Sequence, residues 1–598
     1  MSIMNGKVSV NDLRKSLQHF DWPDYVVFLM MLGGSAVIGI YFGFVEKKSK
    51  TKSFSSEHHE SEAAQEYLMG GRKMSVIPVA VSLVASWISG ISLLGLATEI
   101  YLYGTSYIFI IISLFISSAV IHYIFLPVFY NLQLTSVYEY LEIRFDKRVR
   151  LLGSILYAIA TLAYLPVVIY VPALAFNQAT GVNIHIVTPF VCAVCIFYTS
   201  VGGLKAVVWT DCLQTVAMLL SMVVIIIKGT SDISGFQAVW TRNHEGDRLN
   251  YPELTLDLTE RHSVLSLLIG GVTFHIYTCG MGQEMIQRYV SLPTQKDANK
   301  ALLVFTILMG LFVIICCYNG LLAYAYYAGC DPLTTKLINA ADQLLPLLLM
   351  NVLGSYRGMP GLFIAGIFSA ALSTLSTCLN SMAAIVLEDF VKPFARTPLS
   401  EKLTNYLMRG TVLVIGVISV CLVFVVERMG TVLQLSITLS GMTGGPIFGM
   451  FTIGFMCPWV KQRGAFVGGI VSLAAMVWML ISAQHAMASG ELTFAVRPLT
   501  TDNCSYTFPS HLSTTKQESY AASNAEEESA IPIHHMSYLF YPIFGAAISI
   551  IVSSLISLAF KEQSKNKLSP TLFSPFVRKY LYSTVSPTDE FETKDTQL

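Results

Sequence analysis

Long apolar blocks separated by short polar segments dominate the pattern of hydrophobic and polar positions along this chain. Each block approaches or exceeds the roughly 20 residues that an α-helix needs to cross a bilayer core. Solid apolar blocks favour helices over the alternating strands of a membrane barrel. The pattern therefore predicts an all-α polytopic membrane protein with about 13 transmembrane helices, near residues 25–45, 75–98, 105–130, 151–177, 184–201, 207–228, 263–285, 300–328, 360–390, 405–427, 431–457, 464–485 and 537–560.

The second apolar block has polar residues and a glycine in its middle, at Ser89, Gly90 and Ser92. In a regular helix the carbonyl groups of Ala85 and Ile88 accept hydrogen bonds from the amides of residues 89 and 92. A helix that unwinds around Ser89-Gly90 leaves these carbonyls free, which is tolerated at membrane depth only inside protein or beside a cavity. Free carbonyls at such a break coordinate small cations in transporters. The segment therefore predicts a broken helix at an ion site.

A second irregular block covers residues 263–285, where four glycines interrupt an apolar stretch. It opens the second group of five spans, as the 75–98 block opens the first. Interrupted helices in corresponding positions of two halves indicate an inverted-repeat transporter. We therefore expect a first five-helix repeat over 75–228 and a second over 263–457.

The ninth block carries six serine and threonine residues between positions 369 and 381. Ala370, Ser373 and Thr374 share one helix face because they are spaced i, i+3 and i+4. Their oxygens, with the carbonyls of Ala85 and Ile88, make five neutral ligands, which suit Na⁺ better than a divalent ion that recruits carboxylates. The alternative is a tight helix contact whose hydroxyls bond back to carbonyls one turn earlier.

Charge supports the membrane interpretation and gives an orientation. The 598 residues are 54% hydrophobic and 13% charged, with a formal net charge of zero, so a nucleic-acid-binding surface is not expected. With residue 1 outside, the inner segments hold 26 of the 38 Lys and Arg residues, as the positive-inside rule requires. The expected segments outside the two repeats are an extracellular N-terminus (1–24), an additional helix (25–45), a helix (464–485), an extracellular loop (486–536), a last helix (537–560) and a cytoplasmic tail (561–598).

Three features of the polar segments suggest modifications or partners. Asn503 begins the only N-x-S/T sequon and lies in the expected extracellular loop, where glycosylation is possible. Cys330 and Cys504 both fall in expected outer loops, so a disulfide between them is possible. The chain ends Thr596-Gln597-Leu598, an ending that suits strand addition to a PDZ groove; a chance ending is the alternative.

A nucleophile–base pair, a carboxylate dyad and a metal signature are not apparent, so an enzyme is not expected.

The chain resembles the sodium:solute symporter family in several long motifs. They read VSLVASWISGISLLGLATEIYLYG, LTSVYEYLEIRF, YVPALAFNQATG, YTSVGGLKAVVWTD, QEMIQRYV and LSTLSTCLNSMAAIVLEDF. The chain is most similar to the branch of monocarboxylate, multivitamin and iodide symporters. The resemblance covers residues 25 to 460 and implies a LeuT-like inverted-repeat fold that works by alternating access.

The resemblance also implies roles for individual residues. Ala85, Ile88, Ala370, Ser373 and Thr374 fall where the family binds its coupling sodium ion. Ser89, Ser92 and Tyr164 fall where the iodide-like branch places a second sodium ion and part of the substrate site. The expected substrate cavity comprises Trp87, His275, Tyr277, Leu433 and Ile437.

Two residues depart from the iodide symporters, which have glutamine in place of Ser92 and tryptophan in place of His275. An organic anion is therefore favoured over iodide. His275 either donates to a solute carboxylate or is a packed, neutral side chain bonded to a backbone carbonyl.

Charged residues near the span ends have competing interpretations. Asp211 either attracts sodium leaving the cavity or pairs with Lys205, and the pairing is favoured. Glu388 and Asp389 are expected to be solvated, with Lys392 nearby. Glu99 and Tyr101 are expected near the outer mouth, where they shape entry.

The expected function is sodium-coupled symport of a small organic anion, a monocarboxylate or a vitamin such as biotin or pantothenate, across the plasma membrane. Two alternatives remain at this stage. One is symport of iodide or another inorganic anion. The other is a solute sensor that has the same fold but does not transport.

Overall fold

The computed structural model describes residues 9–16, 20–46, 66–397, 399–427, 432–489, 491, 494, 496–508, 535–560 and 569–584. Within these residues the regular structure is helical, apart from one isolated bridge between Ser9 and Thr507. Continuous apolar sequence forms helices here because a helix satisfies all its backbone hydrogen bonds internally. The all-α prediction is confirmed.

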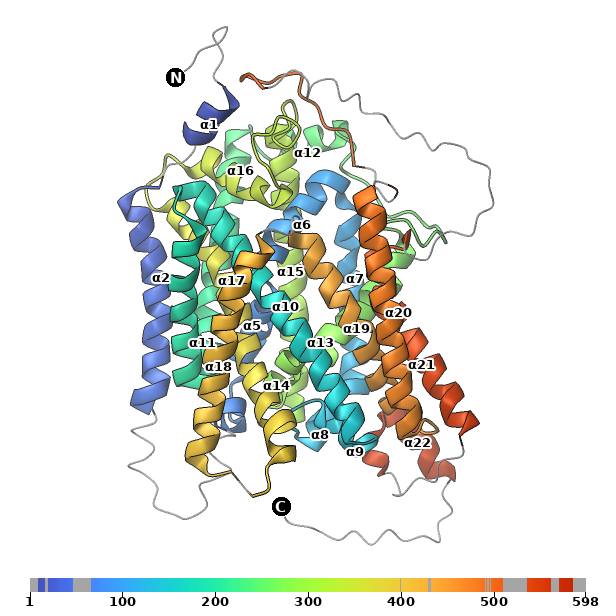
Figure 1. Cartoon of the computed structure of the whole chain (residues 1–598). Helices are drawn as coiled ribbons and strands as arrows, with labels where there is room; N and C mark the ends of the chain where they lie inside the picture. Colours follow the sequence, from blue (N-terminus) through green and yellow to red (C-terminus); the bar gives the residue numbers. More distant parts are fainter. Residues whose placement is uncertain are drawn as a thin grey trace.

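Most of the predicted spans appear as long helices that run roughly parallel in Figure 1. The long helices are α2 (Trp22–Ile40), α7 (Ile110–Val120) with α8 (Leu126–Leu132), α10 (Lys147–Thr180), α11 (Ile184–Asp232), α15 (Gln295–Tyr327), α17 (Met359–Ile385), α18 (Glu401–Val426), α19 (Val432–Met456), α20 (Gln462–Ser489) and α21 (Tyr541–Ala559). Within the described residues, nine helices are long and apolar enough to span a membrane, or ten if one bent pair is a single span.

The two irregular blocks form interrupted helices, as predicted. The first consists of α5 (Val76–Trp87) and α6 (Gly90–Tyr103), which are bent by 64°. The second consists of a π-helical turn (Ser266–Gly270), α13 (Gly271–Gly280) and α14 (Gln283–Tyr289). Each interruption places two helix ends in the interior of the bundle.

The predicted spans 184–201 and 207–228 are joined in the single element α11 and have no separate loop between them. Gly203 is its one non-helical residue, with φ 58° and ψ −155°. An L-residue with a side chain rarely adopts this conformation, whereas glycine does so readily. A Cβ at this position would also lie 2.6 Å from the Tyr67 carbonyl oxygen. The chain therefore turns at one glycine where a short loop was expected.

Short helices cover the two ends of the bundle. Figure 1 places α1 (Val10–Ser16), α12 (Phe236–Glu245) and α16 (Leu344–Leu353) at one end, and α9 (Glu139–Arg144) and α22 (Pro575–Thr584) at the other. The helices α1 and α22, near the two chain ends, therefore lie at opposite ends of the molecule. This arrangement is what an odd number of spans requires.

The helix α17 lies at the centre of the fold. It packs against α11, α10, α2, α18 and α5, and each of its Ser and Thr residues between 369 and 381 is buried. Small residues allow α17 to pack closely against α11. A Cβ added at Gly366, for example, would lie 2.4 Å from the Ser221 hydroxyl of α11. The hydroxyl-rich sequence of α17 is thus enclosed by protein and does not face lipid.

Candidate functional site

The interruption between α5 and α6 is built by two residues in extended conformation. Ile88 has φ −82° and ψ 113°, and Ser89 has φ −98° and ψ 167°. The Ser89 hydroxyl accepts a hydrogen bond from the Ser92 amide at 3.2 Å, so Ser89 is the N-cap of α6. The predicted break is therefore present. Its two non-helical residues are Ile88 and Ser89, and Gly90 is the first residue of α6.

Thr374 connects the broken helix to α17. Its hydroxyl lies 3.0 Å from the Ala370 carbonyl oxygen and 3.3 Å from the Ile88 carbonyl oxygen. Of the five predicted ligand residues, Thr374 therefore has its hydroxyl within hydrogen-bonding reach of the carbonyl oxygens of two others, Ala370 and Ile88. The fourth, Ser373, is adjacent in sequence, and the fifth, Ala85, is buried in the last turn of α5.

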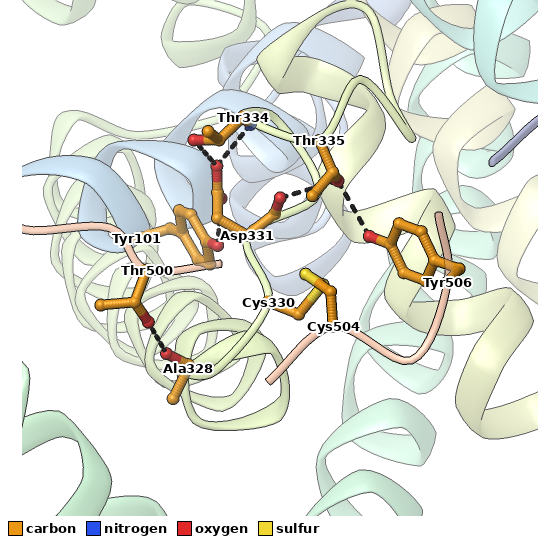
Figure 2. Close-up of a disulfide and its surroundings, with 9 residues drawn as sticks. All are labelled: Tyr101, Ala328, Cys330, Asp331, Thr334, Thr335, Thr500, Cys504 and Tyr506. Atoms are coloured by element: carbon orange, nitrogen blue, oxygen red, sulfur yellow. Dashed lines mark hydrogen bonds between the residues drawn. A yellow bond between two sulfur atoms is a disulfide. The ribbon is translucent and has the colours of Figure 1, made fainter. Parts of the chain in front are cut away.

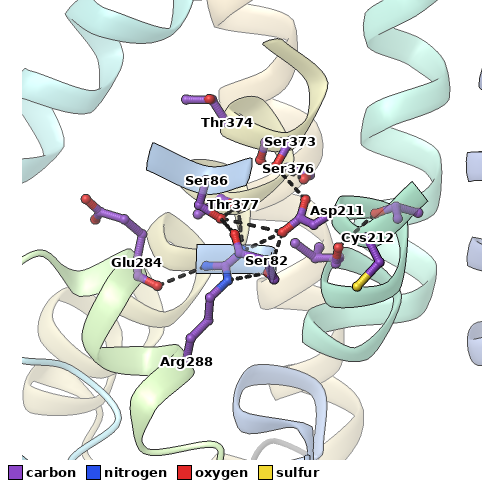
Figure 3. Close-up of polar contacts among 12 residues, drawn as sticks. Ser82, Ser86, Asp211, Cys212, Glu284, Arg288, Ser373, Thr374, Ser376 and Thr377 are labelled. Carbon is purple, nitrogen blue, oxygen red and sulfur yellow. Dashed lines mark hydrogen bonds and ion pairs between the residues drawn. The ribbon is translucent and has the colours of Figure 1, made fainter. Parts of the chain in front are cut away.

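Asp211 of α11 lies directly beside this group of oxygens (Figure 3). Its Oδ1 accepts a hydrogen bond from Ser373 at 2.6 Å, and its Oδ2 accepts one from Ser82 at 2.5 Å. Arg288 of α14 completes the cluster, with its Nη2 3.1 Å from Asp211 Oδ2. Both charged side chains are almost fully buried, at 0% and 1% exposure. Such a pair is stable only when its remaining polar atoms are also bonded.

The remaining polar atoms of the pair do have partners. Arg288 Nε donates to the Ser82 hydroxyl at 2.7 Å, and Nη2 donates to Thr377 at 2.6 Å. The Thr377 hydroxyl is in turn 3.0 Å from that of Ser86. The cluster thereby joins α5, α11, α14 and α17 at the level of the break.

The predicted pairing of Asp211 with Lys205 was wrong. Lys205 instead pairs with Glu46 at 3.2 Å and with Glu66 at 2.8 Å. The two residues lie about one and two-thirds turns apart on α11, so they point in different directions. Sequence proximity suggested a partner, whereas helix geometry turned Asp211 towards α14. A charged residue inside an apolar helix is itself a signal of function, and it could have directed attention to Arg288.

One cavity of about 340 Å³ joins the predicted substrate residues. Trp87, Ser89, Ser92, Tyr164, His275 and Tyr277 all line it, together with Thr374. The described substrate residues therefore meet around one cavity, where α5, α6, α10, α13 and α17 converge, and Thr374 is the one of the five predicted sodium-ligand residues that lines it. The side chains of Leu433 and Ile437 lie outside the described residues.

Trp87 and His275 form one wall of the cavity. Their rings stack with centroids 5.6 Å apart, and Trp87 Nε1 donates to Thr278 at 3.4 Å. His275 Nδ1 is 2.8 Å from the Gly271 carbonyl oxygen. A carbonyl only accepts, so Nδ1 carries the hydrogen and Nε2 of the neutral ring is an acceptor. His275 is thus both a cavity residue and a packed histidine bonded to the backbone, and it cannot donate from Nε2 while neutral.

An ion pair lies where the last turns of α6 meet the residues before α13, at one end of the cavity. Arg261 donates to Glu99 through Nε at 2.6 Å and through Nη2 at 3.1 Å, and His262 Nε2 is 3.1 Å from the same carboxylate. The guanidinium also lies over the Tyr103 ring at 4.4 Å. Glu99 and Arg261 both line the cavity, and the outer position of Glu99 stays a prediction. Tyr101 is instead buried and donates to Asp331 at 2.6 Å.

The expectation that Asp389 is solvated was wrong. The carboxylate is 0% exposed and pairs with Arg150 of α10 at 2.5 Å. Ser136 and Ser154 each donate to its Oδ2 at 2.7 Å. A π-helical turn over Val386–Val391 follows α17 and places Asp389 against α10. Glu388 has the expected neighbour, since it pairs with Lys392 at 2.7 Å, but its side chain is only 13% exposed and is not fully solvated as expected.

A disulfide connects Cys330, after α15, to Cys504, after α20 (Figure 2). The possible bridge is therefore present in the structure. Neighbouring bonds support it, including one of 2.8 Å between the Thr335 and Tyr506 hydroxyls. Asn503, beside the bridge, is exposed. The terminal residues Thr596–Leu598 lie outside the described residues.

Comparisons with known proteins agree with this architecture. The family model of the sodium:solute symporter family matches residues 67–472. The chain is 36% identical to sodium-coupled monocarboxylate transporter 1 of Xenopus laevis over 544 residues, covering 90% of this chain and 85% of the relative. It is 33% identical to a putative sodium-dependent multivitamin transporter of Drosophila melanogaster, covering 90% and 86%.

A solved structure of a Na⁺-coupled sialic acid symporter, substrate-bound and outward-open, has the same fold. The TM-score is 0.72 at 21% identity, covering 91% of this chain and all of the other. The chain belongs to the sodium:solute symporter family. It is a multi-pass membrane transporter with a LeuT-like fold and sodium as coupling ion, not an enzyme.

Proposed function

We propose that this protein couples the inward flow of sodium to the uptake of a small organic anion, a monocarboxylate or a vitamin, across the plasma membrane. The observation that carries the proposal is the contact of Thr374 with the Ile88 carbonyl at the helix break. Relatives named as monocarboxylate and multivitamin transporters match about nine tenths of the chain, which supports this solute class.

The proposed sodium site comprises Ala85, Ile88, Ala370, Ser373 and Thr374. Its ligands are neutral hydroxyl and carbonyl oxygens, which suit a monovalent cation. Asp211 adds a negative charge one hydroxyl away, since Ser373 donates to it at 2.6 Å. A sodium ion held between the end of α5 and α17 would replace the Thr374 hydrogen bonds and hold the two helices in one arrangement.

The solute is proposed to bind beside this site. Ser89 and Ser92 line the cavity at the N-terminus of α6, where the positive end of the helix dipole favours an anionic group. Tyr164 and Tyr277 supply hydroxyl groups, and Trp87 supplies an apolar surface. Ile88 of the sodium site and Ser89 of the solute site are the two consecutive residues of the break, so binding at one site orders the backbone that the other uses.

Energy for uptake comes from the sodium gradient and the membrane potential. Each charge moved through 100 mV is worth about 2.3 kcal/mol, so one or two sodium ions per cycle suffice to concentrate a solute. After binding, the two helical repeats rock against each other and open the cavity to the cytosol. The ion pair of Glu99 with Arg261 at the outer end is well placed to separate and re-form in this cycle.

The function is tested by uptake into proteoliposomes that contain the full-length protein. Labelled butyrate, nicotinate, biotin, pantothenate and iodide are each offered with an inward sodium gradient and with potassium in its place. Sodium-dependent accumulation of a carboxylate supports the proposal. Accumulation of iodide alone supports the inorganic alternative, and solute binding without accumulation in any arm supports a sensor.

We also infer that the C-terminal Thr596-Gln597-Leu598 binds a PDZ domain by strand addition. A peptide of the last ten residues is expected to bind a panel of PDZ domains, and the same peptide with Leu598→Ala is the matched control. Equal binding of both peptides contradicts the inference.

A further inference from the structure

The inner end of the cavity holds a carboxylate that the symport of a plain anion does not need. Glu284, the second residue of α14, lines the cavity. Its Oε2 accepts a hydrogen bond from the Tyr157 hydroxyl of α10 at 3.1 Å. Figure 3 shows the carboxyl group directed away from Arg288, whose Nη1 donates only to the Glu284 backbone oxygen at 2.9 Å.

The charges around the cavity do not balance. Its charged side chains, among the residues that the structure describes, are Glu99, Arg261 and Glu284. Glu99 and Arg261 neutralise each other through two hydrogen bonds. No basic side chain in the described chain forms an ion pair with the Glu284 carboxylate. A carboxylate removed from bulk water is costly unless a cation or several donors face it. The donors to Glu284 are the Tyr157 hydroxyl and the residue's own backbone amide, and the nearby Arg288 is paired with Asp211.

Other groups on the cavity wall also suit a positive group. Tyr138, Tyr157, Tyr277 and Trp87 present aromatic rings to the cavity, and ring faces attract ammonium groups. His275 Nε2 is an acceptor while the ring is neutral, because Nδ1 donates to Gly271. The opposite pole is the N-terminus of α6 at Ser89 and Ser92, where a carboxylate is favoured. The cavity therefore has one end for a negative group and one for a positive group.

We propose that Glu284 binds a positively charged group of the transported solute, so that the preferred solute is a zwitterion carrying an ammonium group as well as a carboxylate. The solute carboxylate lies at the start of α6, and its ammonium group donates to Glu284 and lies against the tyrosine rings. This inference rests on the proposed sodium-coupled symport, keeps the solute carboxylate and adds an ammonium group to the solute, which then has no net charge.

The test compares solutes that differ by one ammonium group. Full-length protein in proteoliposomes is offered butyrate or 4-aminobutyrate, and propionate or β-alanine, with and without a sodium gradient. In at least one pair the amino acid is expected to show the higher kcat/KM. If the plain carboxylate is preferred in both pairs, the inference is wrong while sodium-coupled symport stands. If no solute shows sodium-dependent uptake, the proposed function itself fails.

Variants separate recognition from folding. Glu284→Gln keeps an acceptor for Tyr157 but removes the charge, and it is expected to raise KM for the amino acid roughly tenfold to a hundredfold. KM for the plain carboxylate is expected to stay unchanged or to fall. Glu284→Asp keeps the charge and is expected to retain the preference. The matched control is Glu245→Gln, an exposed residue at the end of α12, which is expected to change neither KM.

Two outcomes of these measurements would overturn the inference. One is an equal rise in KM for both members of a pair in Glu284→Gln. The other is a change in the sodium or pH dependence of butyrate uptake in that variant, which would mean that Glu284 holds sodium or a proton. Should Glu284→Gln fail to fold, thermal stabilisation of the unmodified protein decides: 4-aminobutyrate must stabilise it more than butyrate does in sodium buffer.

Discussion

At the residue scale, the proposed sodium site depends on the oxygen atoms around Thr374. The Thr374 hydroxyl bonds both to its own helix and to the Ile88 carbonyl of the broken helix. A threonine that bonds only to the carbonyl one turn earlier is common in membrane helices. The second contact is with a carbonyl of the helix break, and this position supports the proposed ion site.

Thr374→Ala is expected to raise the sodium concentration for half-maximal uptake roughly tenfold, since one ligand worth about 1.5 kcal/mol is lost. Sodium titration of uptake measures this change. Thr411→Ala on α18 is the matched control, because Thr411 has the same bond to a carbonyl one turn earlier at 2.8 Å but no contact with the break. An unchanged sodium titration in Thr374→Ala would remove Thr374 from the site.

A second prediction concerns the buried pair of Asp211 and Arg288. Asp211→Asn leaves the arginine charge buried without its partner, which costs about 3–5 kcal/mol. The thermal midpoint of the purified protein is expected to fall accordingly. Asp232→Asn, which removes a surface pair on the same helix, is the control, with a cost of about 0–1 kcal/mol.

The double variant Asp211→Asn with Arg288→Gln tests the physical reason. It removes both charges, so it is expected to be less destabilised than the sum of the two single variants. Strict additivity would show that the two side chains act independently.

At the element scale, helix interruptions place polar groups inside an apolar bundle. The α5–α6 break leaves Ile88 and Ser89 outside the helices. The short helix α14 places Glu284 at the cavity and Arg288 beside Asp211. Regular helices in these positions would present only side chains to the cavity. Interruptions are therefore what allow the backbone itself to take part in binding.

The turn in α11 offers a test at this scale. Gly203→Ala is expected to destabilise the protein by at least 1–2 kcal/mol, because alanine is strained at positive φ and its Cβ would meet Tyr67. Expression and thermal midpoint measure the effect. Gly410→Ala is the control on α18, where a Cβ has no heavy atom within 4 Å and the change is expected to stabilise the helix slightly. Equal behaviour of the two variants would contradict the strained turn.

At the scale of the whole molecule, residues that are far apart in the sequence are joined at the end of the bundle that carries α12 and α16 (Figure 1). The disulfide joins residues 174 positions apart, and Arg248 connects α6 to the segment after α20, with Nη2 2.9 Å from the Pro498 carbonyl oxygen. Disulfides form in oxidising compartments. The bridge therefore supports an extracellular position for this face and, with it, the predicted orientation.

The orientation is tested by glycosylation. If the loop with Asn503 lies outside, glycosidase treatment of protein from mammalian cells is expected to lower its apparent mass, and Asn503→Gln is expected to abolish that shift. Cys330→Ser with Cys504→Ser is expected to lower the thermal midpoint, by the equivalent of about 2–5 kcal/mol. A mass that glycosidase does not change, together with a midpoint insensitive to the cysteines, would argue against the predicted orientation.

The sequence by itself determined the membrane class, the interrupted helices and the hydroxyl-rich helix beside them. These follow from local rules: apolar length, helix-breaking residues and the i, i+4 spacing of Ala370 and Thr374. The resemblance in long motifs added the family, and the cavity residues Trp87, Ser92 and His275 do meet around one space.

Only the tertiary structure decided the partners of the charged residues. Asp211 pairs with Arg288, 77 positions away, and Asp389 pairs with Arg150, 239 positions away. Helix rotation and packing choose such partners, and neither is written in the local pattern. The tautomer of His275 and the unbalanced charge of Glu284 were decided in the same way, because both depend on which atoms surround a side chain after the helices have packed.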